Sequence, residues 1–192
     1  MERSIALLRG VNVGGARKIR MAELREHLSR SGLEDAQTYI QSGNLLVRSD
    51  AVGDELRIRI ESAIARAFGF PVDVVVISPG RLAALLHADP FADRDVPDDP
   101  TRRYFTFLVD EPDPAAAEEL TGGTYEPDEV AMADGLVYLL IGNRYGASKL
   151  SNAFIEETLR VRATTRNLRT LRALLELADQ ASTVTTIDRD PP

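Results

Sequence analysis

Short apolar runs alternate with polar, glycine-bearing loops along the first third of the chain. Residues 4–9 form an apolar run that predicts a strand, and residues 11–20 form a polar loop. Residues 21–31 carry apolar side chains at helical spacing and stop at Gly32, a residue typical of helix C-caps. We therefore expect a strand, a loop and a helix, in that order.

The next segments extend this order to β-α-β-β-α-β. Strand-like runs at residues 36–41 and 45–49 flank a compact polar turn at residues 42–44. An amphipathic helix is predicted over residues 52–68, and a run rich in β-branched side chains over residues 72–77 predicts the fourth strand. The order is that of a ferredoxin-like split βαβ fold, with four antiparallel strands and two helices.

The second half of the chain begins with the same order of elements, without a matching repeat of residues. The predicted elements are a connecting helix over 78–87, a strand over 104–110, a helix over 114–120, hairpin strands over 129–133 and 136–141, and helices over 148–159 and 166–179. We therefore expect an α+β protein of two ferredoxin-like (alpha-beta plait) subdomains packed together, at residues 1–88 and 101–179. An acidic, proline-rich linker is expected at 89–100, and a mobile polar tail at 180–192.

The predicted first and fourth strands are apolar on both faces. In the first strand Ile5 and Leu7 alternate with Ala6 and Leu8, and such a sheet must be covered twice. The helices of the first half cover one face, and the second half of the chain is the available cover for the other. The pattern also argues against an RNA-recognition module, because that module needs exposed aromatic residues on its central strands.

Composition narrows the class of protein. The chain has 44% hydrophobic and 28% charged residues, and it contains neither an apolar run long enough to span a membrane nor the pattern of a secretory leader. The absence of cysteine excludes disulfides, thiolate catalysis and zinc fingers, and fits a reducing cytoplasm. Its two histidines are isolated from each other, so we expect no metal site.

The net charge is −7, and acidic and basic residues are concentrated in different segments of the chain. Residues 89–134 carry 14 acidic side chains and three arginines, whereas residues 1–25 carry six basic and two acidic side chains, and residues 144–172 seven and two. Only two of the 23 basic residues are lysines, Lys18 and Lys149. Because arginine and lysine are not interchangeable, these two positions mark candidate sites.

The strongest candidate site is the loop after the first strand, with Arg9, Asn12, Gly14, Gly15 and Lys18. Glycines let backbone N–H groups approach a ligand, the next helix offers its positive N-terminus, and the bases add charge. The spacing is not that of a phosphate-binding P-loop, because Ala16 and Arg17 stand where lysine and serine or threonine are needed. The alternative is a tight turn surrounded by solvated arginines.

Topology brings a second segment to the same place. The first two strands of a split βαβ fold run parallel, so the loop after the first strand and the hairpin turn after the second lie at one end of the sheet. Gln41, Ser42 and Asn44 should therefore lie beside the basic loop and complete an anion pocket. The alternative is an ordinary polar turn.

A second group of candidate residues lies near the C-terminus: Lys149, Asn152, Thr165, Arg166 and Asn167. The predicted helices place Lys149 and Arg166 in first turns, where their charge opposes the helix dipole unless an anion binds. In the alternative interpretation, these side chains extend into solvent or toward the acidic segment.

Templates for catalysis are absent. The chain has no Gly-x-Ser-x-Gly, Ser-x-x-Lys or His-Glu-x-x-His motif, and neither His27 nor His87 lies beside a nucleophile. We therefore assign no catalytic residue and no cofactor, and leave open whether the protein is an enzyme.

Several motifs together resemble one family. They are the segments at residues 8–15, 21–24, 38–44, 148–152 and 163–167 (LRGVNVGG, MAEL, TYIQSGN, SKLSN and ATTRN). In this order they are similar to the bacterial domain of unknown function 1697 family, with coverage of about residues 3–178. The resemblance implies two ferredoxin-like subdomains and no established activity. Twelve of the thirteen candidate residues named above lie within these segments, and Lys18 lies between the first two of them. The resemblance implies that all thirteen are characteristic positions of the family.

The leading hypothesis is a cytoplasmic protein that binds a phosphate- or carboxylate-bearing small molecule, such as a nucleotide, between its halves. Any chemistry there would rest on charge stabilisation, because no acid-base pair is visible. A nucleic-acid binder that uses the same basic edges is the second hypothesis, disfavoured by the net charge. A protein-interaction module without a ligand is the third. No membrane partner is expected, and the oligomeric state is not predicted.

Overall fold

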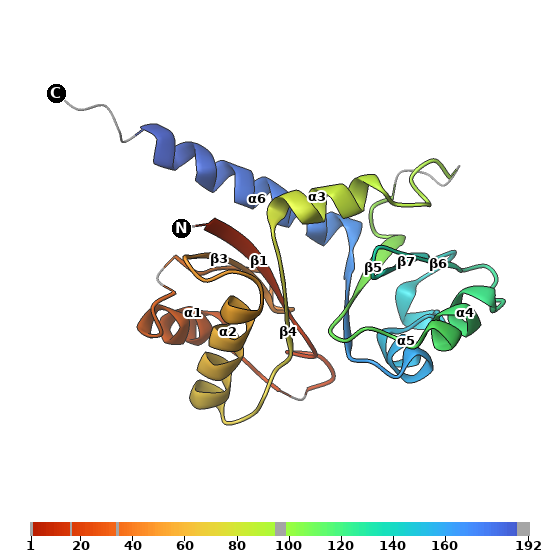
Figure 1. Ribbon diagram of the computed structural model, residues 1–192, viewed down its shortest axis with the longest axis horizontal. Coiled ribbons are helices and arrows are strands. Elements are labelled where there is room, and N and C mark those ends of the chain that lie inside the picture. Colours follow the sequence, from red (N-terminus) through yellow and green to blue (C-terminus); the bar gives the residue numbers. More distant parts are fainter. Residues whose placement is uncertain (1, 16, 34, 95–98, 188–192) are drawn as a thin grey trace. The chain divides into compact units, whose positions relative to one another are not determined.

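The computed structural model describes residues 2–15, 17–33, 35–94 and 99–187. The chain divides into two compact units: unit 1 comprises residues 1–83 and 172–192, and unit 2 comprises residues 84–171. Each unit contains a four-stranded antiparallel sheet together with helices (Figure 1), which confirms the predicted α+β class. Within the described part of the chain, no helix is long and apolar enough to cross a membrane.

Unit 1 follows the predicted β-α-β-β-α-β order. Its elements are β1 (Glu2–Leu8), α1 (Met21–Arg30), β2 (Gln37–Tyr39), β3 (Asn44–Ser49), α2 (Gly53–Phe68) and β4 (Val74–Ile77). The strands lie in the order β2-β3-β1-β4, and each neighbouring pair is antiparallel. Because β1 and β2 both run antiparallel to β3, they are parallel to each other, as the ferredoxin-like prediction requires.

The helices α1 and α2 cover one face of this sheet (Figure 1). Leu24 and Leu28 of α1 and Leu56 and Ile60 of α2 are fully buried in one apolar cluster with Leu8 of β1. Each such side chain contributes roughly 1.5 to 3 kcal/mol by leaving water. The same cluster anchors both ends of the loop between β1 and α1.

The opposite face is apolar as well, and the C-terminal helix α6 (Leu168–Ile187) belongs to its cover. Ile5 and Leu7 of β1 are fully buried, as is Leu174 of α6. Residues 172–187 of α6 group with unit 1, and Arg3 Nη1 donates a 2.6 Å hydrogen bond to the Ala178 carbonyl. The C-terminal segment therefore packs in the unit to which the N-terminal strand belongs.

The helix α6 is also longer than the sequence suggests. The tail was expected from residue 180, but the helix continues to Ile187, and residues 188–192 lie outside the described part. A helix that is already formed lengthens at little cost, even through residues of modest helix propensity such as Thr185 and Thr186.

Unit 2 is a complete β-α-β-β-α-β fold. Its elements are β5 (Arg103–Leu108), α4 (Pro114–Gly122), β6 (Glu129–Ala133), β7 (Leu136–Leu140), a 3-10 helix η1 (Tyr145–Ala147), α5 (Asn152–Leu159) and β8 (Ala163–Asn167). The strand order is β6-β7-β5-β8, the same as in unit 1 for equivalent strands. The predicted second half lacked β8, because Ala-Thr-Thr-Arg-Asn has no apolar alternation. It is an edge strand, and its polar residues pair with β5.

The first part of the expected linker is anchored in unit 2. It follows α3 (Pro79–His87). Asp89 is buried and forms an ion pair of 3.1 Å with Arg103, and its other oxygen accepts a 3.0 Å hydrogen bond from the Phe91 N–H. Residues 95–98 of the linker lie outside the described part.

Candidate functional site

The loop after β1 and the β2–β3 hairpin turn meet in unit 1, as predicted. The Leu8 N–H donates to the Gly43 carbonyl at 2.8 Å, and the Asn12 side-chain amide donates to the Gln41 carbonyl at 2.7 Å. Parallel β1 and β2 deliver both segments to one end of the sheet.

Asn12 closes the loop as well as joining it to the hairpin. Its Nδ2 donates to the Ile19 carbonyl at 3.0 Å, and its Oδ1 accepts from the Ile19 N–H at 2.9 Å. Its φ of +57° is a left-handed conformation that asparagine tolerates better than most residues. Asn12 was predicted to bind a ligand, and that stays a prediction; its contacts show that it fixes the shape of the loop.

A pocket of about 370 Å³ lies where these segments meet. Its lining residues come from the loop between β1 and α1 and from the hairpin turn: Asn12, Gly15, Lys18, Ile19, Arg20 and Gln41. Four of them, Asn12, Gly15, Lys18 and Gln41, are predicted site residues. Only Ile19 and Arg20 of the lining residues were not among the predicted site residues.

The charges around this pocket are positive. Lys18 is exposed, and no carboxylate of the described residues lies within ion-pair distance of it. Arg20 forms an exposed ion pair of 3.3 Å with Glu23. The helix α1 begins next to the pocket at Met21, and no side chain caps its N-terminus. The positive end of the helix and the Lys18 ammonium therefore act in the same region.

The remaining predicted residues of unit 1 have structural contacts. Arg9 forms an ion pair with Asp73, at 3.3 Å. Asn44 is fully buried, and its Nδ2 donates to the Tyr39 carbonyl at 3.1 Å and to Ser42 Oγ at 3.0 Å. Ser42 and Asn44 thus hold the hairpin turn that presents Gln41. Gly14, with φ of +62°, shapes the loop without lining the pocket.

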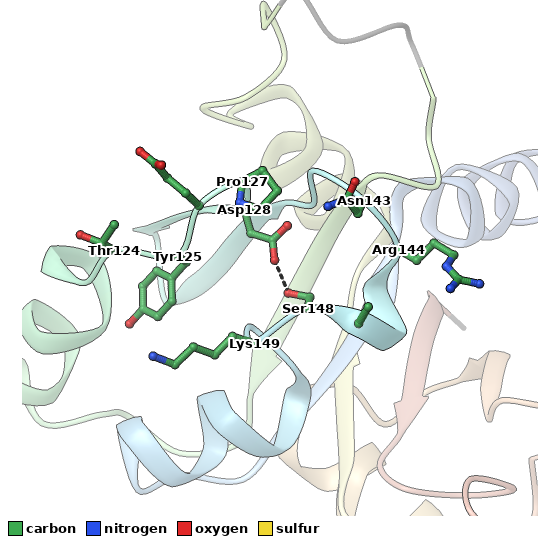
Figure 2. A pocket seen from close by; sticks show the side chains of 10 residues that line it. Thr124, Tyr125, Pro127, Asp128, Asn143, Arg144, Ser148 and Lys149 are labelled. Atoms are coloured by element: carbon green, nitrogen blue, oxygen red, sulfur yellow. Dashed lines mark hydrogen bonds between the residues drawn. The ribbon is translucent and has the colours of Figure 1, made fainter.

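Unit 2 contains a second pocket, of about 390 Å³ (Figure 2). It lies between the segment before β6 and the segment after β7, and its lining includes Tyr125, Asp128, Arg144, Ser148 and Lys149. Asp128 ties the two walls together, because its Oδ1 accepts from the Gly142 N–H at 2.7 Å and its Oδ2 accepts from Ser148 Oγ at 2.6 Å. The Asp128 carboxylate therefore has a structural role, because it connects the two walls of the pocket.

Lys149 does not lie in the first turn of a helix, contrary to the prediction. The N-cap of α5 is Ser151, and the helix begins at Asn152. Lys149 therefore lies three residues before the first residue of the helix. Its ammonium lies 5.5 Å from the centre of the Tyr125 ring and 5.4 Å from that of Phe154. In Figure 2 the side chain extends toward Tyr125. Two aromatic rings thus stabilise its charge.

Arg166 is also placed differently from the prediction. It lies in β8 and is buried, and Nη1 donates to Thr164 Oγ1 at 2.7 Å and to the Thr165 carbonyl at 2.9 Å. Burial lowers the pKa of Arg166 to about 10, against an opposing effect of Tyr145. The prediction failed because the polar strand β8 was not recognised. A buried guanidinium cannot receive an anion from solvent without a change in its surroundings.

Asn152, Thr165 and Asn167 have structural roles in unit 2. Thr165 Oγ1 donates to Asn152 Oδ1 at 2.8 Å, and Asn152 Nδ2 donates to the Ala163 carbonyl at 3.2 Å. Asn167 Oδ1 accepts from the Thr170 N–H at 2.9 Å and so caps the start of α6. Of the five predicted residues in unit 2, only Lys149 lines the second pocket.

The two predicted groups occupy opposite ends of equivalent sheets. In unit 1 the loop follows the end of β1. In unit 2, Asn167 pairs with Tyr104 at the beginning of β5, the strand equivalent to β1. The missed residues Tyr125 and Asp128 lie in an aperiodic Gly- and Pro-containing loop, where the only sequence signal is the density of turn residues.

The fold defines an α+β protein with two ferredoxin-like units, and a pocket with basic lining residues lies beside the loop after its first strand. The chain belongs to the family described as protein of unknown function (DUF1697), whose model matches residues 1–138. It is similar to a conserved bacterial protein from Streptococcus pneumoniae of known structure. The two are 25% identical with a TM-score of 0.70, and the match covers 92% of this chain and 98% of that one. A comparison with curated proteins gives no match.

Proposed function

We propose that this protein binds a small molecule with a phosphate or carboxylate group in the unit 1 pocket. The observation that carries the proposal is Lys18, an exposed ammonium on the wall of a preformed pocket, with no carboxylate of the described residues within ion-pair distance. A cation at the positive end of α1 is unfavourable by itself, and an anion bound beside both would reverse this.

The neighbouring groups supply further recognition. Arg20 adds a second cation, the Gln41 side chain offers an amide, and Gly15 permits close approach of the backbone. A volume of about 370 Å³ fits a small molecule. The described lining residues include no acid-base pair and no hydroxyl or carboxylate nucleophile, so any catalysis would act through charge stabilisation by Lys18 and Arg20.

Nucleic-acid binding is the weaker candidate. A net charge of −7 repels a polyanion, and the pocket offers two basic side chains, not an extended basic surface. The unit 2 pocket is a weaker anion site too, because Lys149 is already stabilised by two rings. We place the protein in the cytoplasm, which its lack of cysteine supports.

The two lysines provide a matched pair of variants for the test. Melting temperature is measured with inorganic phosphate, acetate, nucleotides, sugar phosphates, coenzyme A and short oligonucleotides, since a ligand that binds the folded state raises it. The proposal expects a small anion to stabilise the parent and the Lys149→Glu variant, and Lys18→Glu to remove the shift. A response only to oligonucleotides, or a response that survives Lys18→Glu, would overturn it.

A further inference from the structure

Two exposed aliphatic residues are next, in the chain, to residues that line the unit 1 pocket. Among the described residues, four large hydrophobic side chains are exposed: Val13 (65%), Ile40 (52%), Val52 (48%) and Ile58 (54%). Val13 directly follows Asn12, and Ile40 directly precedes Gln41, and both of these neighbours line the pocket. The hydrogen bond from Asn12 to the Gln41 carbonyl holds the two segments together. Val13 and Ile40 are therefore the chain neighbours of two residues that this hydrogen bond holds together.

Ile40 has an unfavourable backbone conformation as well as an exposed side chain. Its φ is +50°, in the left-handed region. A β-branched residue is disfavoured there, because its Cβ crowds the backbone, and glycine or asparagine would fit with less strain. Strain of this kind gathers at functional positions, where the side chain is needed for contact with something else.

Single exposed aliphatic residues need no explanation, so position and strain distinguish Ile40 from the others. Ile58 lies on α2 and does not line the pocket. Ile40 instead lies one residue from the wall that Lys18 and Arg20 share with Gln41. Cationic side chains on the wall, with exposed aliphatic residues next to two wall residues in the chain, suit a molecule with an anionic group and an apolar body.

We propose that the ligand of this pocket is an alkyl or aryl phosphate or carboxylate, and that Ile40 and Val13 contact its apolar group. This inference rests on the proposed function, and it narrows the ligand class. The anionic group lies toward Lys18 and Arg20, and the apolar group covers the two aliphatic side chains. A sugar phosphate, which is polar throughout, would leave them in contact with polar groups or water and gain nothing from them.

The test compares probes that differ only in the apolar group. Isothermal titration calorimetry on the full chain measures inorganic phosphate against hexyl phosphate, and acetate against hexanoate. Covering even a few methylenes gives the alkyl probe of a pair an affinity gain of about tenfold or more. Ile40→Asn removes that gain and leaves the binding of inorganic phosphate unchanged. The control Ile58→Thr, at an equally exposed isoleucine, keeps the gain.

The outcomes separate this inference from the proposed function. Equal affinity for both members of each pair, or a gain that survives Ile40→Asn, overturns the inference while the anion site stands. Failure of the alkyl probes to bind overturns the inference. Failure of every small anion in the melting-temperature panel, or binding that Lys18→Glu does not weaken, overturns the proposed function and the inference with it. A melting temperature of Ile40→Asn at or above that of the parent shows that the variant is folded, since asparagine tolerates the left-handed region.

Discussion

The side-chain amide of Asn12 donates a 2.7 Å hydrogen bond to the backbone carbonyl of Gln41, and the same side chain makes two hydrogen bonds to the backbone of Ile19. One residue thus joins the hairpin turn, the loop and the residue that leads into α1. The pocket exists because these three segments are held together.

Replacement of Asn12 by alanine should therefore open the pocket. The variant loses three hydrogen bonds and places alanine at a φ of +57°, so we expect the free energy of unfolding to fall by about 2 to 3 kcal/mol. Urea denaturation measures this loss. Stability within about 0.5 kcal/mol of the parent would show that the loop does not depend on Asn12.

Gly43 and Gly14 form a matched pair with positive φ, +75° and +62°. A Cβ on Gly43 would overlap the Val11 side chain and lie 2.8 Å from Leu8 Cβ, whereas a Cβ on Gly14 meets nothing within 4 Å. Gly14→Ala should cost about 1 kcal/mol from its backbone alone, and Gly43→Ala at least twice that, because core atoms must move. Equal losses in thermal denaturation would contradict the close approach of the hairpin to β1.

Ile40→Gly should stabilise the protein without ligand. Glycine adopts a φ of +50° freely, so relief of strain is expected to raise the free energy of unfolding by up to about 1 kcal/mol, reduced by the greater freedom of glycine in the unfolded chain. Chemical denaturation of the two proteins checks the sign. A loss of more than about 1 kcal/mol would mean that the Ile40 side chain is needed for folding.

The hydroxyl of Tyr145 is buried and makes no hydrogen bond of normal geometry to the described residues. Burial raises the pKa of Tyr145 above its ordinary value, although Thr165, the Asn152 backbone and Arg166 act in the opposite direction. Since a buried hydroxyl without a partner is unfavourable, Tyr145→Phe should leave stability unchanged or raise it by up to about 1 kcal/mol. A large loss in urea denaturation would reveal a hidden partner.

The raised pKa of Tyr145 also predicts a pH dependence. The native protein keeps this proton at a pH where the unfolded chain has lost it, so the contribution is complete below about pH 10 and is lost as pH rises through the native pKa. Tyr145→Phe should therefore lose less stability than the parent between about pH 9 and pH 11. Denaturation curves at several alkaline pH values provide the measurement, and parallel curves would argue against the shift.

Lys149→Ser tests the aromatic contacts in unit 2. Had Lys149 been in a first helical turn, its removal would stabilise the chain, but its place between Tyr125 and Phe154 reverses the expected sign. We expect a loss of about 0.5 to 1 kcal/mol, the usual strength of an exposed cation–π contact. Lys18→Ser is the control, because the aromatic contacts of the described residues do not involve it. A gain in stability for Lys149→Ser would contradict the assigned role.

The pattern of apolar residues was sufficient to predict unit 1 and the meeting of its loop with the hairpin. Parallel β1 and β2 follow from the order of elements, so the proximity of Asn12 to Gln41 follows from topology. The order of elements could not predict which candidate residues make structural contacts instead of lining the pocket. Nothing in the sequence around Asn44 or Arg9 indicates that one holds a turn and the other pairs with Asp73.

In unit 2 the prediction failed where local pattern and tertiary environment disagree. Strand β8 is polar because it is an edge strand, and pairing with β5 overrides its weak pattern. Arg166 was therefore assigned to the first turn of a helix and to an anion site, although it is buried in β8. Tyr125 and Lys149 are far apart in sequence, so their contact depends on the packing of two loops that have no periodicity.

Unit 1 is interrupted in the chain, since it comprises residues 1–83 and 172–192 with the whole of unit 2 between them. During synthesis on the ribosome, all four strands of the first sheet emerge long before residues 172–187 of α6, which belong to the cover of Ile5 and Leu7. Unit 2 can complete its fold while that face is still uncovered, so the nascent chain exposes an apolar sheet surface until α6 is synthesised. Unit 2 is therefore expected to complete its fold before unit 1. A chain truncated before α6 is expected to aggregate.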